Sequence, residues 1–306
     1  MNAIAETAAA LPAARLGPSR PRFVGAVRSE LLKSGRQALT WLMLAGFVVV
    51  SALVLVPTLA SGTARDTLQR SPSTFYFNYL SGMEQLFTIA TGVILLITSS
   101  RLVSMEYGAG TIRIVLARGT SRLGLLAAQY TALVLVGLVL LAGFAVLAAA
   151  VLYGVVLAWH GSFAPITSLP AAAWTDTWIN VLVAMVSIAV CVLLGTAAAV
   201  IGRSVAFGVG AAMALFPADN FGTIVMLLVS RLTHQDVWLK ATQYFLGPVM
   251  NQLPVTLQTD HAVRAAFAAP LVEHVDAIHC WLVIGVYSLA FLAAAIVLTW
   301  RRDVLH

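Results

Sequence analysis

The residues of this chain that could do chemistry on a substrate are few, and one reaction type can be set aside at once. A loop that binds ATP ends in Gly-Lys-Ser or Gly-Lys-Thr, so that backbone amides and the lysine meet the phosphates. The chain has two lysines, Lys33 and Lys240, and each of them follows a leucine. We therefore expect no catalytic residue for ATP hydrolysis and no nucleotide cofactor in this chain.

Histidines and acids gather in the region 231–278, where a zinc site has to be considered. His274 and His279 are five residues apart, whereas two zinc ligands on one helical face need the His-Glu-x-x-His spacing. The sequence thus predicts no metal site. A membrane-embedded enzyme or assembly factor that uses these acids and histidines stays open as an alternative.

A basic segment with several glycines, residues 104–122, is the strongest candidate for a binding site. It contains one acid, Glu106, and three arginines, Arg113, Arg118 and Arg122, and long apolar runs flank it on both sides. Short arginine-rich connections between membrane spans stay in the cytoplasm. We expect a cytosolic partner to dock here; a solvated loop that only fixes topology is the alternative.

The predicted docking residues combine charge, apolar surface and backbone freedom. They are Glu106, Gly110, Thr111, Ile112, Arg113, Leu116, Arg118 and Arg122. Ile112 and Leu116 would supply apolar contact area between the arginines. Gly110 would allow the backbone to turn away from the preceding span, because glycine adopts conformations that other residues avoid.

Composition places these residues in a membrane protein. The chain is 60% hydrophobic and 10% charged, whereas a soluble domain is about 25% charged. Its net charge of +6 could suggest nucleic acid, but the basic residues lie at the ends of apolar runs, as membrane topology requires. Cys191 and Cys280 lie singly at apolar runs and are expected to pack as small hydrophobic residues.

Six apolar runs are long enough to cross a bilayer, whose core of about 30 Å needs roughly 20 helical residues. The predicted spans are 39–59, 83–103, 125–157, 178–201, 205–229 and 279–300. Residues 23–36 have the apolar spacing of an amphipathic helix in the membrane interface. The sequence predicts an all-α polytopic fold, with a disordered tail at 1–22 and one membrane domain at 23–306.

The third run, 125–157, could in principle hold two spans, since a single helix of this length would measure about 50 Å. One span here places Arg203 and Arg301 on the same side of the membrane as the segment 104–122. We therefore expect one long helix. Thirteen of the eighteen basic residues are then cytoplasmic, together with both termini, and the region 231–278 is external in a cell membrane.

Two acids lie in or beside the predicted spans. Asp219 and Asn220 fall in the fifth run, where an ionisable group costs roughly 2.5–3.5 kcal/mol and usually faces a cavity. They are predicted either to line a translocation path or to lie in a turn after Phe216. Glu84 is expected to be an interfacial cap at the external start of the second span.

Several of these motifs together resemble the ABC type-2 transporter permease family. The similarity is strongest in Glu106-Tyr-x-x-Gly-Thr111, followed by Arg113 and by Arg122 at the mouth of a long span. The amphipathic Glu30-Leu-Leu-Lys33 before the first span fits the same layout. One departure is Gln129, where the family usually has a lysine nearby.

The resemblance implies a membrane-spanning permease subunit, with export as the direction. A separate cytosolic ATP-binding-cassette ATPase would hold ATP and magnesium, and a second permease copy or a paralogous permease would complete the pathway. An ATP-independent secondary carrier is the other alternative from a different class. The sequence does not indicate the substrate.

Overall fold

The computed structural model describes residues 23–108, 120–258 and 275–301. These ranges contain helices joined by short connections and no strand. The protein is therefore an all-α polytopic membrane protein, which confirms the predicted fold class. The predicted disordered tail, residues 1–22, lies outside the described residues.

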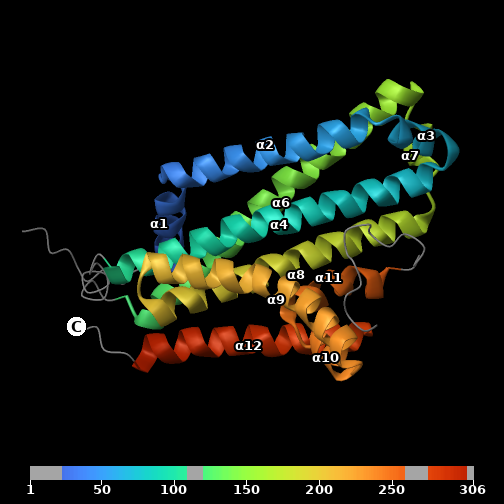
Figure 1. Ribbon diagram of the computed structural model, residues 1–306. Helices are drawn as coiled ribbons and strands as arrows, with labels where there is room; N and C mark the ends of the chain where they lie inside the picture. The colour runs from blue at the N-terminus through green and yellow to red at the C-terminus, as the bar shows by residue number, and fades with distance from the viewer. Residues whose placement is uncertain (1–22, 109–119, 259–274, 302–306) are drawn as a thin grey trace, which may run out of the picture.

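Within each described range the helices follow one another with few connecting residues (Figure 1). They are α1 (Phe23–Gly35), α2 (Ala38–Ala60), α3 (Gly62–Arg70), α4 (Pro72–Gly108), α6 (Arg122–His160), α7 (Ala164–Thr167), α8 (Ala171–Gly202), α9 (Val205–Thr233), α10 (Val237–Thr242), α11 (Leu246–Leu257) and α12 (Ala277–Arg301).

Four of the described helices, α4, α6, α8 and α12, are long and apolar enough to cross a membrane. The pair α1 and α2, bent by 64°, can count as a fifth span. In α9 the apolar stretches Val205–Leu215 and Phe221–Thr233 are each shorter than a span, although the helix runs through both. The predicted span 205–229 therefore stays a prediction.

The helix that contains the second predicted span, 83–103, is longer than this span, because α4 begins at Pro72 and ends at Gly108. Its first turns are helical although they are partly polar, because their aromatic residues are buried against neighbouring helices. The ring of Phe75 lies 6.2 Å from that of Trp159 in α6, and the Tyr76 hydroxyl lies 2.6 Å from the Thr177 hydroxyl in α8.

This longer helix changes the position of Glu84. The side chain lies twelve residues inside α4, so it does not cap the first turn of this helix. Its predicted place at the membrane interface stays a prediction. The residues before Glu84 are partly polar, so hydropathy along the sequence did not show that the helix begins at Pro72.

The third run forms one continuous helix, α6, as predicted. Its first turn is capped by the hydroxyl of Ser121, which accepts from the amide of Gly124 at 3.0 Å. At the other end Gly161 adopts the left-handed conformation, with φ of 72°, which ends the helix at little steric cost. No polar turn interrupts the helix, so it crosses the bundle once.

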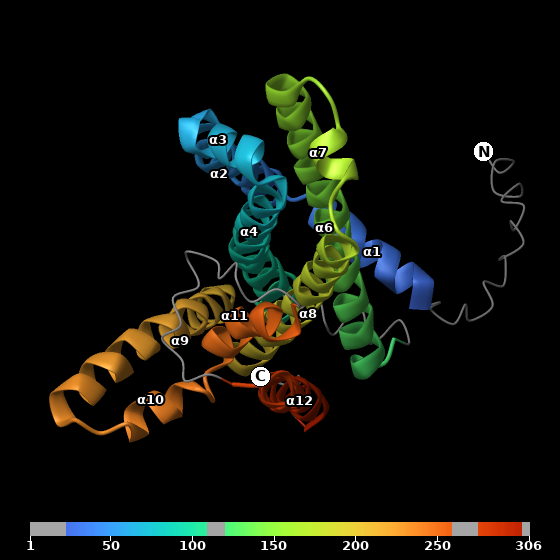
Figure 2. The ribbon, with the colours of Figure 1, turned by 90° about the vertical axis from the view of Figure 1, so that its right-hand side faces the viewer.

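The centre of the bundle is the contact between α4 and α8 (Figure 2). The two helices approach closely at Gly195, where an added Cβ would collide with the Ser99 hydroxyl and lie 3.2 Å from the carbonyl of Leu96. Ser100 donates a hydrogen bond across the same contact to the carbonyl of Gly195 at 3.2 Å. Small residues at such contacts let membrane helices pack backbone to backbone.

One end of the bundle gathers the segments that were predicted to be cytoplasmic. Figure 1 shows α1, the end of α4, the start of α6, the α8–α9 connection and the end of α12 together at this end, with α3 and α7 at the other. The α8–α9 connection is tight: Arg203 is left-handed, with φ of 51°, and Ser204 caps α9. The prediction that α6 crosses the membrane once, which places Arg203 and Arg301 on the same side as the segment 104–122, is consistent with this arrangement.

Candidate functional site

The described parts of the segment 104–122 are its two ends. Ser104 to Gly108 form the last turns of α4, and Arg122 begins α6. The predicted docking residues between them, Gly110, Thr111, Ile112, Arg113, Leu116 and Arg118, lie outside the described residues. The site can therefore be built from Glu106, Arg122 and what surrounds the two helix ends.

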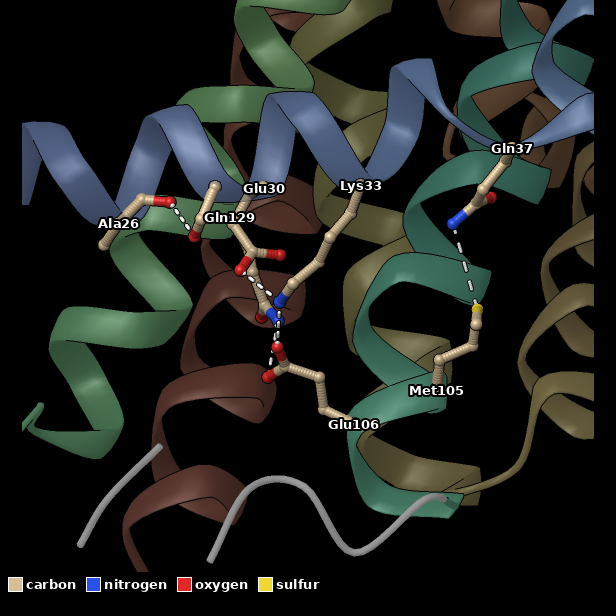
Figure 3. Close-up of polar contacts among 8 residues, drawn as sticks. Ala26, Glu30, Lys33, Gln37, Met105, Glu106 and Gln129 are labelled. Carbon is tan, nitrogen blue, oxygen red and sulfur yellow. Dashed lines mark hydrogen bonds and ion pairs between the residues drawn. The ribbon is translucent and has the colours of Figure 1, made fainter. Parts of the chain in front are cut away.

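Glu106 is buried, with its side chain 7% exposed, and its carboxylate lies between three helices (Figure 3). Lys33 of α1 donates to its Oε1 at 2.7 Å. Gln129 of α6 donates to its Oε2 at 3.1 Å. The carboxylate thus joins the end of α4 to α1 and to the first turns of α6.

Glu30 completes this group, which we call the hinge cluster: Glu30, Lys33, Glu106 and Gln129. Lys33 lies 2.6 Å from Oε1 of Glu30, whose side chain is 1% exposed. The other oxygen of Glu30, Oε2, is buried and has no hydrogen-bond partner among the described residues. The ammonium of Lys33 therefore pairs with two buried carboxylates, those of Glu30 and Glu106.

The environment shifts both partners on α1 in the same direction. Burial raises the pKa of Glu30, and the hydrogen bond from Lys33 offsets this only in part. Burial lowers the pKa of Lys33, but its hydrogen bonds to Glu106 and Glu30 outweigh that effect and leave the pKa raised. Lys33 therefore stays charged at neutral pH, and the raised pKa of Glu30 means that this acid ionises less readily than it would in water.

Apolar and polar contacts hold α1 in this position. Val27 of α1 packs with Ala128 and Ala132 of α6 in a small buried group. At the bend into α2, the indole of Trp41 donates to the carbonyl of Gly35 at 2.9 Å. The hydroxyl of Thr40 donates to the carbonyl of Ser34, also at 2.9 Å. Side-chain donors thus satisfy carbonyls at the end of α1, which a helix end otherwise leaves free.

The amphipathic helix predicted at residues 23–36 is α1, and the structure adds that one of its faces packs against the bundle. The helix is amphipathic, but Val27, Glu30 and Ser34 are buried against protein. The spacing of three to four residues that predicted an apolar face is the spacing of this buried face. Glu30 is a charged residue on this buried face. The sequence pattern, which assigns charged residues to the solvent side, did not show that this one faces inward.

Asp219, predicted for the translocation path, lies within the continuous helix α9. The alternative that α9 ends near Phe216, with Asp219 and Asn220 in a turn, is therefore wrong. Oδ2 of Asp219 accepts from the amide of Gly247 at 3.3 Å, in the first turn of α11. A carboxylate at this place satisfies a free amide and suits the positive end of the helix dipole.

The histidines of the region 231–279 are only partly described. The ring Nε2 of His279 lies 2.9 Å from the carbonyl oxygen of Gln243, and its amide donates to Asp276 at 2.9 Å, so these groups fix the start of α12. The described residues contain no group of three or more histidines, cysteines or acids that could hold a metal ion. His261 and His274 lie outside the described residues.

Sequence reasoning found Glu106 but missed its partners Lys33 and Gln129. A signal existed for both, since Lys33 is one of two lysines and Gln129 stands where the resemblance led us to expect a lysine. The structure explains this departure. The neutral amide of Gln129 donates a hydrogen bond, while the positive charge comes from α1.

Comparison with protein families gives a match that includes the whole hinge cluster. The model described as ABC-2 family transporter protein matches residues 26–216, from α1 into α9 and over more than half of the chain. A comparison with curated proteins gives no match.

Proposed function

The chain belongs to the ABC-2 transporter family, and we propose that it is the membrane permease subunit of an exporter driven by a separate cytosolic ATPase. The partner would bind ATP and magnesium and hydrolyse the nucleotide. A second copy of this chain, or a paralogous permease, would supply the other half of the pathway. The permease assignment follows from the family, whereas the direction and the partners are our proposal.

The observation that carries the proposal is the hinge cluster. Three helices meet there at the end of the bundle where the chain leaves α4 and returns to α6. A displacement of the segment between these helices acts on Glu106 and Gln129, and through Lys33 on α1. The cluster would therefore turn a local push by a partner into a joint movement of α1, α4 and α6.

Within this proposal the docking residues have two roles. Ile112, Leu116 and the arginines Arg113, Arg118 and Arg122 would contact the ATPase, together with Gly110 and Thr111. Glu106 would not touch the partner, because its carboxylate is buried among α1 and α6. It would instead transmit force from the docking segment to the helices.

The proposed topology places the hinge cluster and both termini in the cytoplasm and the region 231–278 outside a cell membrane. The joint position of α1, α4, α6 and α12 ends in Figure 1 supports a common side for them. Single cysteines introduced at Thr111 and Asp260 check the orientation. Only Asp260→Cys should react with an impermeant reagent added to intact cells, and reaction of Thr111→Cys would overturn the topology.

Coupled ATP hydrolysis tests the function itself. The permease, reconstituted with the ATPase that co-purifies with it, should stimulate hydrolysis, and Ile112→Ser combined with Leu116→Ser should remove this stimulation. Lys33→Met should weaken it, while Lys240→Met, at the other and exposed lysine, serves as the matched control. Unchanged stimulation in the Ile112→Ser/Leu116→Ser variant would show that the segment is only a topology loop.

A further inference from the structure

Arg101 of α4 carries a charge that nothing in the described part of the chain neutralises. Its Nε atom is buried and has no hydrogen-bond acceptor among the described residues. The ion pairs within these residues belong to Lys33 and Arg70. Because an arginine stays protonated in proteins, the guanidinium needs an acceptor that comes from elsewhere.

Arg101 lies on the side of α4 that neighbouring helices leave partly open. Ile97 and Met105, one turn before and one turn after it, share its helix face; Ile97 is half-buried and Met105 is exposed. Leu102 and Val103, which point to other sides of the helix, are buried. Since α4 is long and apolar enough to cross a membrane, this open face meets the bilayer.

The contact between Gln37 and Met105 indicates the depth of Arg101 in the bilayer. Nε2 of Gln37, just before α2, lies 3.9 Å from Sδ of Met105 near the end of α4 (Figure 3). Trp41 follows Gln37 by four residues and Arg101 precedes Met105 by four, so each lies about 6 Å further along its helix. Trp41 is 63% exposed, as a tryptophan of the interfacial belt is. Arg101 therefore belongs to the interfacial layer, where lipid headgroups lie.

The side chain of Arg101 is held in place and is still accessible. The burial of Nε fixes the base of the guanidinium against the protein, whereas the residue as a whole is half-buried. Arginines within spans usually face the bundle interior or pair with another group, and those near helix ends extend toward the headgroups. The planar guanidinium matches a phosphate group, to which it can donate two parallel hydrogen bonds.

We propose that Arg101 and Gln37 bind the headgroup phosphate of an anionic phospholipid. The guanidinium would donate to the phosphate oxygens. Gln37 would add a neutral donor, because its amide nitrogen meets only a weak acceptor in Sδ of Met105. The helix α2 begins at Ala38, and the positive end of its dipole would also favour an anion. The inference goes beyond the proposed function, from which it takes only the cytoplasmic side of this end.

The apolar residues beside Arg101 favour a lipid over a soluble anion. Val93 and Ile97 precede Arg101 by two turns and one turn of α4 and are half-buried, so acyl chains could lie against them. A soluble anion would gain nothing from this apolar continuation. The cytoplasmic leaflet also contains anionic lipids, and a lipid reaches an open helix face from the bilayer without an enclosed cavity.

Native mass spectrometry of the full-length permease, purified alone in mild detergent, tests the inference. The probe is dioleoylphosphatidylglycerol, and dioleoylglycerol has the same chains without the phosphate. Wild type should bind the phospholipid at least about tenfold more tightly, because a hydrogen bond to a charged group contributes on this scale. Dioleoylphosphatidylcholine should bind less tightly than the anionic lipid, because its choline brings a second positive charge. Inorganic phosphate should not displace the bound lipid.

Variants locate the site. Arg101→Met should lower the affinity for dioleoylphosphatidylglycerol about tenfold or more and leave that for dioleoylglycerol unchanged. Arg101→Lys should retain part of the affinity, since it keeps the charge but not the planar fork. The matched control is Arg301→Met, at an exposed arginine of α12 at the same end of the bundle, which should change the affinity by less than about fivefold. Thermal unfolding checks each variant, and Arg101→Lys decides if Arg101→Met unfolds at a lower temperature.

Several results would overturn the inference. They are equal affinity for the phospholipid and dioleoylglycerol in wild type, wild-type affinity in Arg101→Met, and equal affinity for the two phospholipids. Displacement by inorganic phosphate would assign the site to a soluble anion. Loss of a dimer in Arg101→Met with lipid binding intact would assign Arg101 to a contact between copies. Because no ATPase is present, these outcomes are independent of the coupling test of the proposed function.

Discussion

Replacement of Lys33 by methionine should release α1 from the bundle. Methionine keeps much of the length and apolar character of the lysine stem but removes the ammonium that lies 2.6 Å from Glu30 and 2.7 Å from Glu106. Glu106 would keep its bond from Gln129, whereas the Glu30 carboxylate would lose its ion pair. Two buried acids would then face each other without a cation.

The cost follows from the burial of the three side chains. Loss of one partner from a fully buried ion pair costs about 3–5 kcal/mol, and an exposed pair is worth about 0–1 kcal/mol. The carboxylates are 1% and 7% exposed, but Lys33 is 45% exposed, so the cluster lies between these limits. We expect docking of α1 to weaken by about 2–4 kcal/mol.

The assay is the labelling rate of a cysteine placed in the α1 contact under native conditions. Ser34 is 4% exposed, so Ser34→Cys should react only when α1 opens. The native Cys191 and Cys280 are buried at 1% and 0% exposure and give a low background. Lys33→Met should accelerate labelling about thirtyfold to several hundredfold, since each 1.4 kcal/mol is a factor of ten.

Two controls make the result decisive. Lys240→Met, at the exposed lysine of α10, should leave the rate within about threefold of wild type. Glu106→Gln in the Lys33→Met background should recover part of the loss, because it removes one uncompensated charge. Equal labelling rates in Lys33→Met and Lys240→Met would refute the reasoning, and the hinge cluster would then contribute no more than a surface ion pair.

Three further predictions concern other parts of the structure. Gly195→Ala should destabilise the protein by about 1–3 kcal/mol through overpacking in detergent unfolding, while Gly210→Ala, with no atom within 4 Å of the added Cβ, should not. Asp219→Ala should weaken the packing free energy of α11 by about 0.5–2 kcal/mol. Cys280 packs in the same buried group as α11, so it should be labelled faster in this variant. An unchanged labelling rate would contradict the capping role of Asp219. Glu30→Gln should gain stability relative to wild type as pH rises above 4.5, the ordinary pKa of this acid. The raised folded-state pKa of Glu30 stabilises the wild-type fold at low pH, and this contribution is lost as pH rises through the folded-state pKa. A stability difference between variant and wild type that does not change between about pH 4 and 8 would contradict this role of Glu30.

Hydropathy predicted the all-α polytopic class and the long single helix α6, because both depend on composition and length alone. It misplaced the beginning of α4, where Phe75 and Tyr76 stabilise polar turns through contacts with α6, α7 and α8. Such contacts join residues far apart in the sequence. A window along one helix cannot detect them.

The candidate site also depends on contacts between distant residues, which the sequence alone did not reveal. The sequence marked Glu106 as important, because it begins the docking motif, but placed it at a surface. Its burial depends on Lys33, which is 73 residues away along the chain. Charge patterning predicts which residues are basic or acidic at a membrane boundary, but the pairing of particular charges requires the helices to be placed in space.

The length of α6 has a mechanical consequence. With 39 residues it measures about 58 Å, nearly twice the thickness of the hydrocarbon core. Its first turns are joined to the hinge cluster through Gln129, and its far end lies beside α7 at the opposite side of the bundle. If α6 moves as a stiff lever, a rotation of about 10° around Gln129 carries the far end, about 46 Å away, through about 8 Å, enough to separate helices that were in contact.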